Sequence, residues 1–86
     1  MTISFKDIEI AYKKIKDYIT KTPLVSNDYI NNLLDADVYF KLENLQNTGS
    51  FKLRGAMHKM LTLSSDIIDN GVVAYSSGNH AQAVAY

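Results

Sequence analysis

The chain has 86 residues, of which 47% are hydrophobic and 21% are charged, and its nine basic side chains balance nine acidic ones. This length allows one domain at most, and the composition is that of a globular protein rather than a disordered one. The balanced, interspersed charge excludes a basic surface for nucleic acid or anionic lipid. The absence of cysteine excludes disulfides and zinc–thiolate sites.

The start of the chain carries no signal for secretion or membrane insertion. Residues 1–7 lack the apolar core of a signal peptide, and no apolar run reaches the length of a membrane span. Small secreted domains usually need disulfides, which this chain cannot form. We therefore expect a cytoplasmic protein that binds neither a membrane nor nucleic acid.

The first predicted element is an amphipathic helix over residues 5–19. Ser4 and Asp7 form a variant of the capping box, and apolar residues then recur at helical spacing. Pro23 disfavours helical geometry at the residue before it, so it ends this segment.

The rest of the chain predicts helices that alternate with short strands. In chain order these are a helix over 28–34, a strand over 38–42, a polar loop over 44–50, a helix over 51–63, a turn over 69–71, a strand over 72–75, a polar loop over 76–80 and the start of a helix from 81. We expect Ser26 or Asn27 to cap the helix over 28–34, and Ser50 to cap the helix over 51–63.

This order of elements predicts an α/β fold with parallel strands. Two short strands cannot form a covered parallel sheet, and the last helix has no C-terminal signal before Tyr86. We therefore expect the chain to be an incomplete part of one larger α/β domain, with no second domain of its own.

Lys52 is the first candidate for chemistry. It follows Gly49 and Ser50 at the start of a predicted helix, where the helix dipole and the charge of Arg54 both favour the neutral amine. A neutral amine can condense with an aldehyde. The alternative is an ordinary surface lysine on an exposed helix face, which is the usual place for this residue type.

The second candidate is the SSGNH segment, residues 76–80, between a predicted strand and a predicted helix. A loop of this kind presents backbone N–H groups that can hold an anion. The alternative is a simple structural turn, because hydroxyl residues and glycine are common in loops.

The segment KLENLQNTGSFKLRGA, residues 41–56, resembles the cofactor-lysine region of fold-type-II pyridoxal-phosphate-dependent enzymes, whose two-domain fold is like that of the tryptophan synthase β subunit. It is most similar to threonine dehydratases, serine dehydratases and serine racemases. The resemblance implies that Lys52 binds pyridoxal 5'-phosphate covalently and that Phe51 also contacts this cofactor.

The segment SSGNHAQ, residues 76–82, is similar to the loop of the same enzymes that holds the cofactor ring and the substrate carboxylate. The resemblance implies that Asn79 binds the ring hydroxyl, and that Ser77, Gly78, Asn79 and His80 line the substrate site. Ser77 also aligns with the second acid/base of serine racemases.

Two residues separate the chain from other branches of this family. Leu53 and His80 stand where threonine synthases have aspartate and threonine, and cysteine synthases likewise show a different pattern at both segments. Thr22-Pro23-Leu24 and Gly71-Val72-Val73 match further family segments. The resemblance therefore covers nearly the whole chain and favours the dehydratase and racemase branch.

The implied reaction of the full-length enzyme is β-elimination, which converts L-threonine or L-serine to a 2-oxo acid and ammonia in isoleucine biosynthesis or threonine catabolism. Lys52 would take the α-proton as general base. Racemisation would need only a second acid on the opposite face, such as Ser77, so serine racemase is an alternative. The resemblance also implies a homo-oligomer.

The family's phosphate-binding glycine-rich loop lies later in the chain and is absent from these 86 residues. We therefore expect residues 1–86 alone neither to hold the cofactor tightly nor to turn over substrate. Two other hypotheses are a catalytically inactive truncated product and a small-molecule-binding module that uses residues 76–80. No metal site is expected, because His58 has no second ligand at metal spacing.

Overall fold

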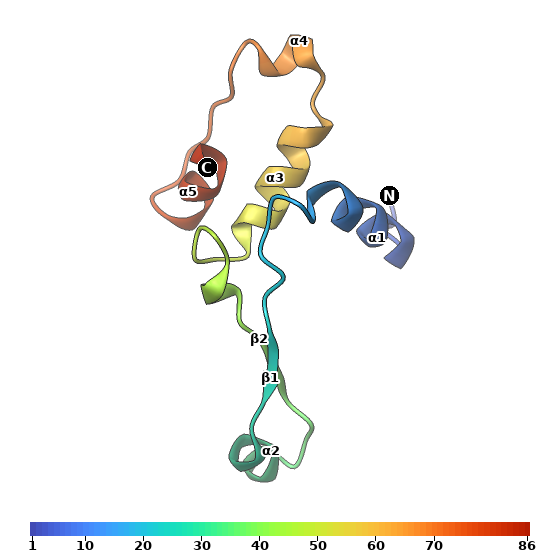
Figure 1. Ribbon diagram of the computed structural model, residues 1–86, viewed down its shortest axis with the longest axis vertical. Helices are drawn as coiled ribbons and strands as arrows, with labels where there is room; N and C mark the ends of the chain where they lie inside the picture. Colours follow the sequence, from blue (N-terminus) through green and yellow to red (C-terminus); the bar gives the residue numbers. More distant parts are fainter.

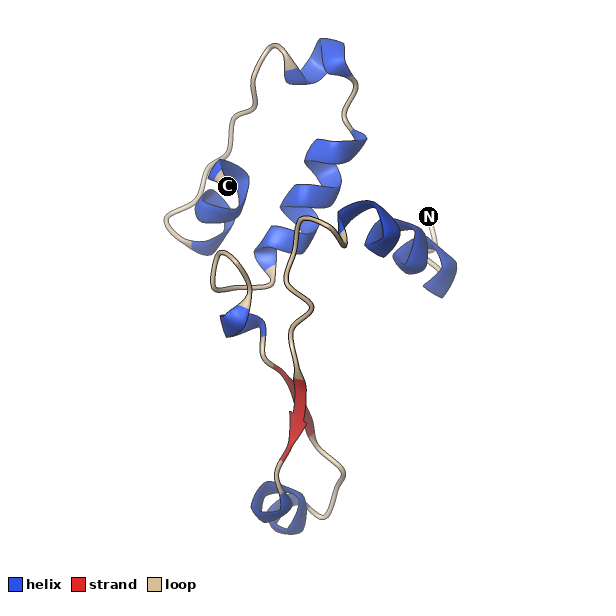
Figure 2. Cartoon of the chain, in the orientation of Figure 1, coloured by secondary structure: helices blue, strands red, loops and turns tan.

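The computed structural model describes all residues from 1 to 86. Figure 1 labels the elements, and Figure 2 separates helix from strand. In chain order they are α1 (Phe5–Ile15), β1 (Leu24–Ser26), α2 (Asp28–Leu34), β2 (Tyr39–Lys41), the 3-10 turn η1 (Glu43–Leu45), α3 (Lys52–Thr62), α4 (Ser65–Ile68) and α5 (Asn79–Ala85).

The molecule is elongated, with extents of 53 × 31 × 25 Å. Helices α1, α3 and α5 gather at one end, and the ribbon of β1 and β2 carries α2 away from them as an arm (Figure 1). None of the helices is both long and apolar enough to cross a membrane.

Helix α1 begins with the predicted capping box. The Ser4 hydroxyl accepts a hydrogen bond from the Asp7 N–H at 3.3 Å, and the Asp7 carboxylate accepts one from the Ser4 N–H at 2.8 Å. The helix ends at Ile15, four residues earlier than predicted. The Tyr18 N–H donates to the carbonyl of Ile15 at 2.8 Å in a tighter turn, which redirects the chain toward the loop before α3.

The arm is built from a cap and a short ribbon. Asn27, one of the two expected caps, accepts a hydrogen bond from the Ile30 N–H at 3.1 Å, and α2 has the predicted bounds. Asp35 ends this helix in the left-handed conformation, with φ of 49°. Strand β1 pairs antiparallel with β2, with Val25 opposite Phe40; β2 lies within the predicted 38–42, whereas β1 was not predicted.

The prediction of two parallel strands was wrong at the second strand. Residues 72–75 form no strand, and the side chains of Val73 and Tyr75 are fully exposed. A strand needs a neighbour to complete its hydrogen-bond ladder, and the only ladder in these 86 residues is the antiparallel pair of the arm. The apolar composition of 72–75 is suited to a buried strand, but no partner lies beside it. Helix α4 was also unexpected.

The core lies where α3 packs against α5. Leu53 is 0% exposed and lies with Ala56 and Ala83, and Met57 and Val84 pack around this group. Helix α3 matches the predicted 51–63 to within one residue at each end, whereas α5 begins two residues before the predicted start. This packing places the first turn of α3 against α5.

Candidate active site

A tight loop delivers Lys52 to the first position of α3. The Gly49 N–H donates to the carbonyl of Gln46 at 2.8 Å, and Gly49 has a φ of 77°. This left-handed conformation favours glycine, because a side chain would be strained there. The predicted cap by Ser50 was wrong in detail: Phe51 is the N-cap residue, while the Ser50 hydroxyl accepts a long hydrogen bond of 3.4 Å from the Lys52 N–H.

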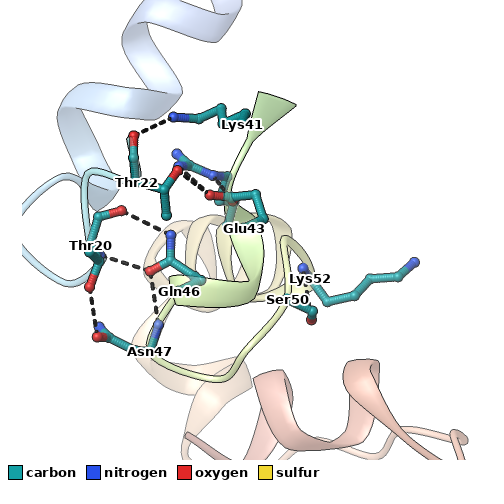
Figure 3. Close-up of polar contacts among 9 residues, drawn as sticks. Thr20, Thr22, Lys41, Glu43, Gln46, Asn47, Ser50 and Lys52 are labelled. Carbon is teal, nitrogen blue, oxygen red and sulfur yellow. Dashed lines mark hydrogen bonds and ion pairs between the residues drawn. The ribbon is translucent and has the colours of Figure 1, made fainter. Parts of the chain in front are cut away.

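The Lys52 amine has no ion-pair or hydrogen-bond partner. Its nitrogen lies 5.2 Å from the centroid of the Phe51 ring, and it forms no ion pair with a carboxylate. The exposed side chain borders a cavity of about 360 Å³. Figure 3 shows it pointing away from Glu43 and Thr22. A primary amine without an anionic partner, beside an open cavity and an aromatic ring, fits covalent attachment of an aldehyde cofactor.

The structure brings part of the SSGNH segment to Lys52. His80, in the first turn of α5, borders the same cavity as Phe51 and Lys52. Ser77, Gly78 and Asn79 are exposed and are not among the residues that line this cavity. The Gly78 N–H donates to the Ser76 hydroxyl at 3.2 Å, which folds the loop back just before the helix.

Arg54 is bound to a carboxylate. Its Nε and Nη2 both donate to the carboxylate of Glu43, the second at 3.1 Å, in a fork that fits the carboxylate geometry. The cation that we expected to act on Lys52 is therefore paired with a carboxylate.

The carboxylate of Glu43 also accepts a hydrogen bond from the Thr22 hydroxyl at 2.5 Å. The hydrogen bonds from Arg54 lower the pKa of Glu43 to about 2, with smaller contributions from Thr22 and from the charges of Arg54 and Lys41, while burial opposes the shift. The same pairing raises the pKa of Arg54. Both groups therefore remain charged over the whole physiological range.

Gln46 forms a second anchor before Lys52. Its side chain is almost completely buried, at 4% exposure. The side-chain oxygen accepts from the Thr20 N–H at 2.8 Å, and the side-chain nitrogen donates to the Thr20 carbonyl at 2.9 Å. Figure 3 shows these bonds joining the lysine loop to the segment after α1.

Sequence reasoning did not find either anchor. Glu43 and Arg54 lie 11 positions apart, and Gln46 and Thr20 lie 26 apart, so neither pair follows a helical or strand period. The only sequence signal for these two anchors is that charged or amide residues flank a loop that contains glycine. That pattern is too common to predict a specific contact. No group of three or more His, Cys, Asp or Glu side chains gathers anywhere in the chain.

Comparison with known proteins identifies relatives of this arrangement. A family model described as "Pyridoxal-phosphate dependent enzyme" matches residues 15–86. The chain is 51% identical over 85 residues to serine racemase from Dictyostelium discoideum, covering 99% of this chain and 26% of the relative. It is 49% identical over 84 residues to the biosynthetic L-threonine dehydratase IlvA from Bacillus subtilis, covering 98% of this chain and 20% of the relative.

The fold of this chain also matches that of a solved structure. The crystal structure of serine racemase from Dictyostelium discoideum superimposes with a TM-score of 0.92 at 50% identity, over 100% of this chain and 28% of the other. The chain therefore spans about a quarter of the length of these relatives, and the predicted fold class is confirmed.

Proposed function

Because the chain belongs to the family of pyridoxal-phosphate-dependent enzymes, we propose that it supplies the cofactor-binding lysine of an enzyme that eliminates water and ammonia from L-threonine or L-serine. The observation that carries this proposal is the unpaired amine of Lys52, which borders one cavity with Phe51 and His80. The relatives include both serine racemase and threonine dehydratases.

The residues take the following roles in this proposal. Lys52 would hold the cofactor through its aldehyde, and Phe51 and Asn79 would also bind the cofactor. Ser77, Gly78, Asn79 and His80 receive the substrate carboxylate. Pyridoxal phosphate, when bound, supplies an electron sink for the α-carbon of the substrate.

The amine of Lys52 also serves as the general base in this proposal. When it is free of the cofactor, the neutral amine of Lys52 would take the α-proton of the substrate. The β-hydroxyl then leaves with a proton as water, and a second water releases ammonia and leaves the 2-oxo acid. The absence of a carboxylate beside the amine supports this role, because an ion pair would hold the amine protonated.

A lysine-to-arginine pair of variants tests the proposal. The protein is expressed from its complete reading frame, incubated with pyridoxal phosphate, reduced with borohydride and mapped by peptide mass spectrometry. We expect the cofactor mass on Lys52 in the wild type and in Lys59→Arg, which alters a lysine two turns along the same helix. Lys52→Arg should lack the adduct and should release no ammonia from threonine. Modification of another lysine, or an active Lys52→Arg variant, would contradict the proposal.

Serine racemase is the second candidate, favoured by the 51% identity and the TM-score of 0.92 to one such enzyme. In that case Ser77 supplies the acid on the face opposite Lys52. Ser77→Ala should then abolish formation of D-serine from L-serine while ammonia release from threonine continues. Unchanged D-serine formation in this variant would remove Ser77 from the role.

A further inference from the structure

The segment that carries Lys52 is closed at its two ends by one ion pair. Glu43, in η1, binds Arg54, in the first turn of α3, and Lys52 lies between them in the sequence. The Thr22 hydroxyl joins the same carboxylate from the segment after α1. We call Glu43, Arg54 and Thr22 the loop clamp.

The loop clamp also fixes how α3 is turned about its own axis. Successive residues of a helix are about 100° apart around the axis, so Arg54 and Lys52 project about 200° apart. Leu53, between them, is held in the core with Ala83 of α5. Arg54 faces Glu43, and Leu53 faces the core. Lys52 therefore lies on the part of the helix surface that faces neither of them.

The observed geometry agrees with this constraint. The Lys52 side chain points away from the two labelled members of the loop clamp in Figure 3, and it borders the cavity that His80 also lines. Nothing else in the chain holds the Lys52 amine by a hydrogen bond or an ion pair. Apart from the Phe51 ring, which lies 5.2 Å from the Lys52 nitrogen, the backbone of the first helical turn determines the direction of the amine.

We propose that the loop clamp positions Lys52: Glu43, Arg54 and Thr22 fix the first turn of α3 so that the amine faces the cavity beside His80. Arg54 borders the same cavity as Lys52, whereas Glu43 and Thr22 do not line it. The clamp is proposed to act through the backbone of α3 and not by contact with the cofactor or the substrate. The inference rests on the proposed role of Lys52 and adds the residues that aim it. A bidentate fork suits this task, because it fixes orientation as well as distance.

The test compares three clamp variants with one control in the protein expressed from its complete reading frame. Glu43→Gln keeps the volume and removes the charge, Arg54→Lys keeps the charge and removes the fork, and Thr22→Val removes a single hydrogen bond. The control is Glu9→Gln, which alters an exposed carboxylate on α1.

Two measurements without cofactor come first. Hydrogen exchange of the backbone amides of residues 51–54 reports whether the first turn loosens. Competitive acylation compares Lys52 with Lys59 on the same helix. We expect faster exchange at 51–54 and an altered Lys52 reactivity in Glu43→Gln, with Lys59 unchanged. Thr22→Val should show smaller changes of the same kind, and it provides the measurement if Glu43→Gln does not fold.

The third measurement adds pyridoxal phosphate and follows the rate of borohydride-trapped adduct on Lys52. Misplacement of a reacting group by about 1 Å can cost about a hundredfold in rate, so we expect Glu43→Gln to slow the adduct by about tenfold to a hundredfold. Arg54→Lys should be slowed as well. In a catalytically active protein, kcat should fall more than KM rises.

The outcomes separate this inference from the proposed function. Wild-type exchange and wild-type Lys52 rates in the clamp variants would overturn the inference, as would equal loosening at Lys59 and throughout the protein, which indicates a purely stabilising role. If the wild type forms no adduct at all, the proposed function fails, and the cofactor-free exchange and acylation results still decide whether the clamp orients Lys52.

Discussion

At the scale of single residues, Glu43 links the largest number of separate segments near the site. Its carboxylate receives donors from Thr22 and Arg54, and its pKa is lowered from 4.5 to about 2. The folded state thus binds this proton less readily than the unfolded state. The stabilisation from Glu43 is therefore present above about pH 4.5 and is lost as the pH falls through 2.

This linkage predicts a pH-dependent effect of Glu43→Gln. At neutral pH, in the protein expressed from its complete reading frame, we expect the substitution to lower the free energy of unfolding by about 1.5–3 kcal/mol, the usual range for hydrogen bonds to a charged group. The difference from wild type should shrink steadily between pH 4.5 and 2, as measured by urea unfolding at several pH values. A difference that stays constant down to pH 2 would show that folding does not lower the pKa of the Glu43 carboxyl.

Gly49 gives a second prediction at the residue scale. A Cβ at this position would meet no other atom within 4 Å, so only the φ of 77° opposes a side chain. Gly49→Ala should therefore destabilise the protein by about 1–2 kcal/mol through backbone strain alone. Thermal unfolding of Gly49→Ala beside Gly49→Asn checks the cause, because asparagine tolerates this conformation better and should cost less.

At the scale of elements, Gln46 is the joint between the lysine loop and the segment after α1. Gln46→Ala leaves the backbone N–H and carbonyl of Thr20 without their partners, and an unmet buried polar group costs about 1–3 kcal/mol. We expect a loss of stability in that range, with faster hydrogen exchange at residues 46–52. Asn44→Ala, at an exposed position two residues earlier, should change neither measurement.

The elements also show which parts of the fold can be predicted from sequence. Helix α2 and the start of α1 were correct because a side-chain cap fixes them locally, through Asn27 and Ser4. The strand predicted for residues 72–75 was wrong, because a strand depends on a neighbour that local composition does not reveal. The position of Lys52 beside His80 depends in the same way on packing between α3 and α5.

At the scale of the whole molecule, too little apolar surface is buried for independent stability. The buried hydrophobic residues are only Ile15, Leu53, Ala56 and Ala83, while side chains such as Phe5, Leu33 and Tyr75 are exposed. Such a core cannot offset the entropy of ordering 86 residues. Large apolar side chains are thus exposed in a chain that spans about a quarter of its relatives' length.

This imbalance predicts the behaviour of residues 1–86 expressed alone. We expect strong binding of a hydrophobic dye, fast exchange of most amides and no stable adduct with pyridoxal phosphate on Lys52. Dye fluorescence, hydrogen exchange and absorbance of the mixture measure these three properties. A well-protected monomer that holds the cofactor would contradict the prediction and would show that the small core suffices.

The bonds from Thr20 and Thr22 have one more consequence. A shortened protein that begins after Pro23 would keep Phe51, Lys52 and the whole SSGNH segment, so every group proposed to touch cofactor or substrate would survive. It would nevertheless lose the groups that meet Gln46 and one of the donors to Glu43. Damage to the leading stretch of the protein should thus disable a reactive amine some thirty positions downstream, even though no reacting atom has been removed.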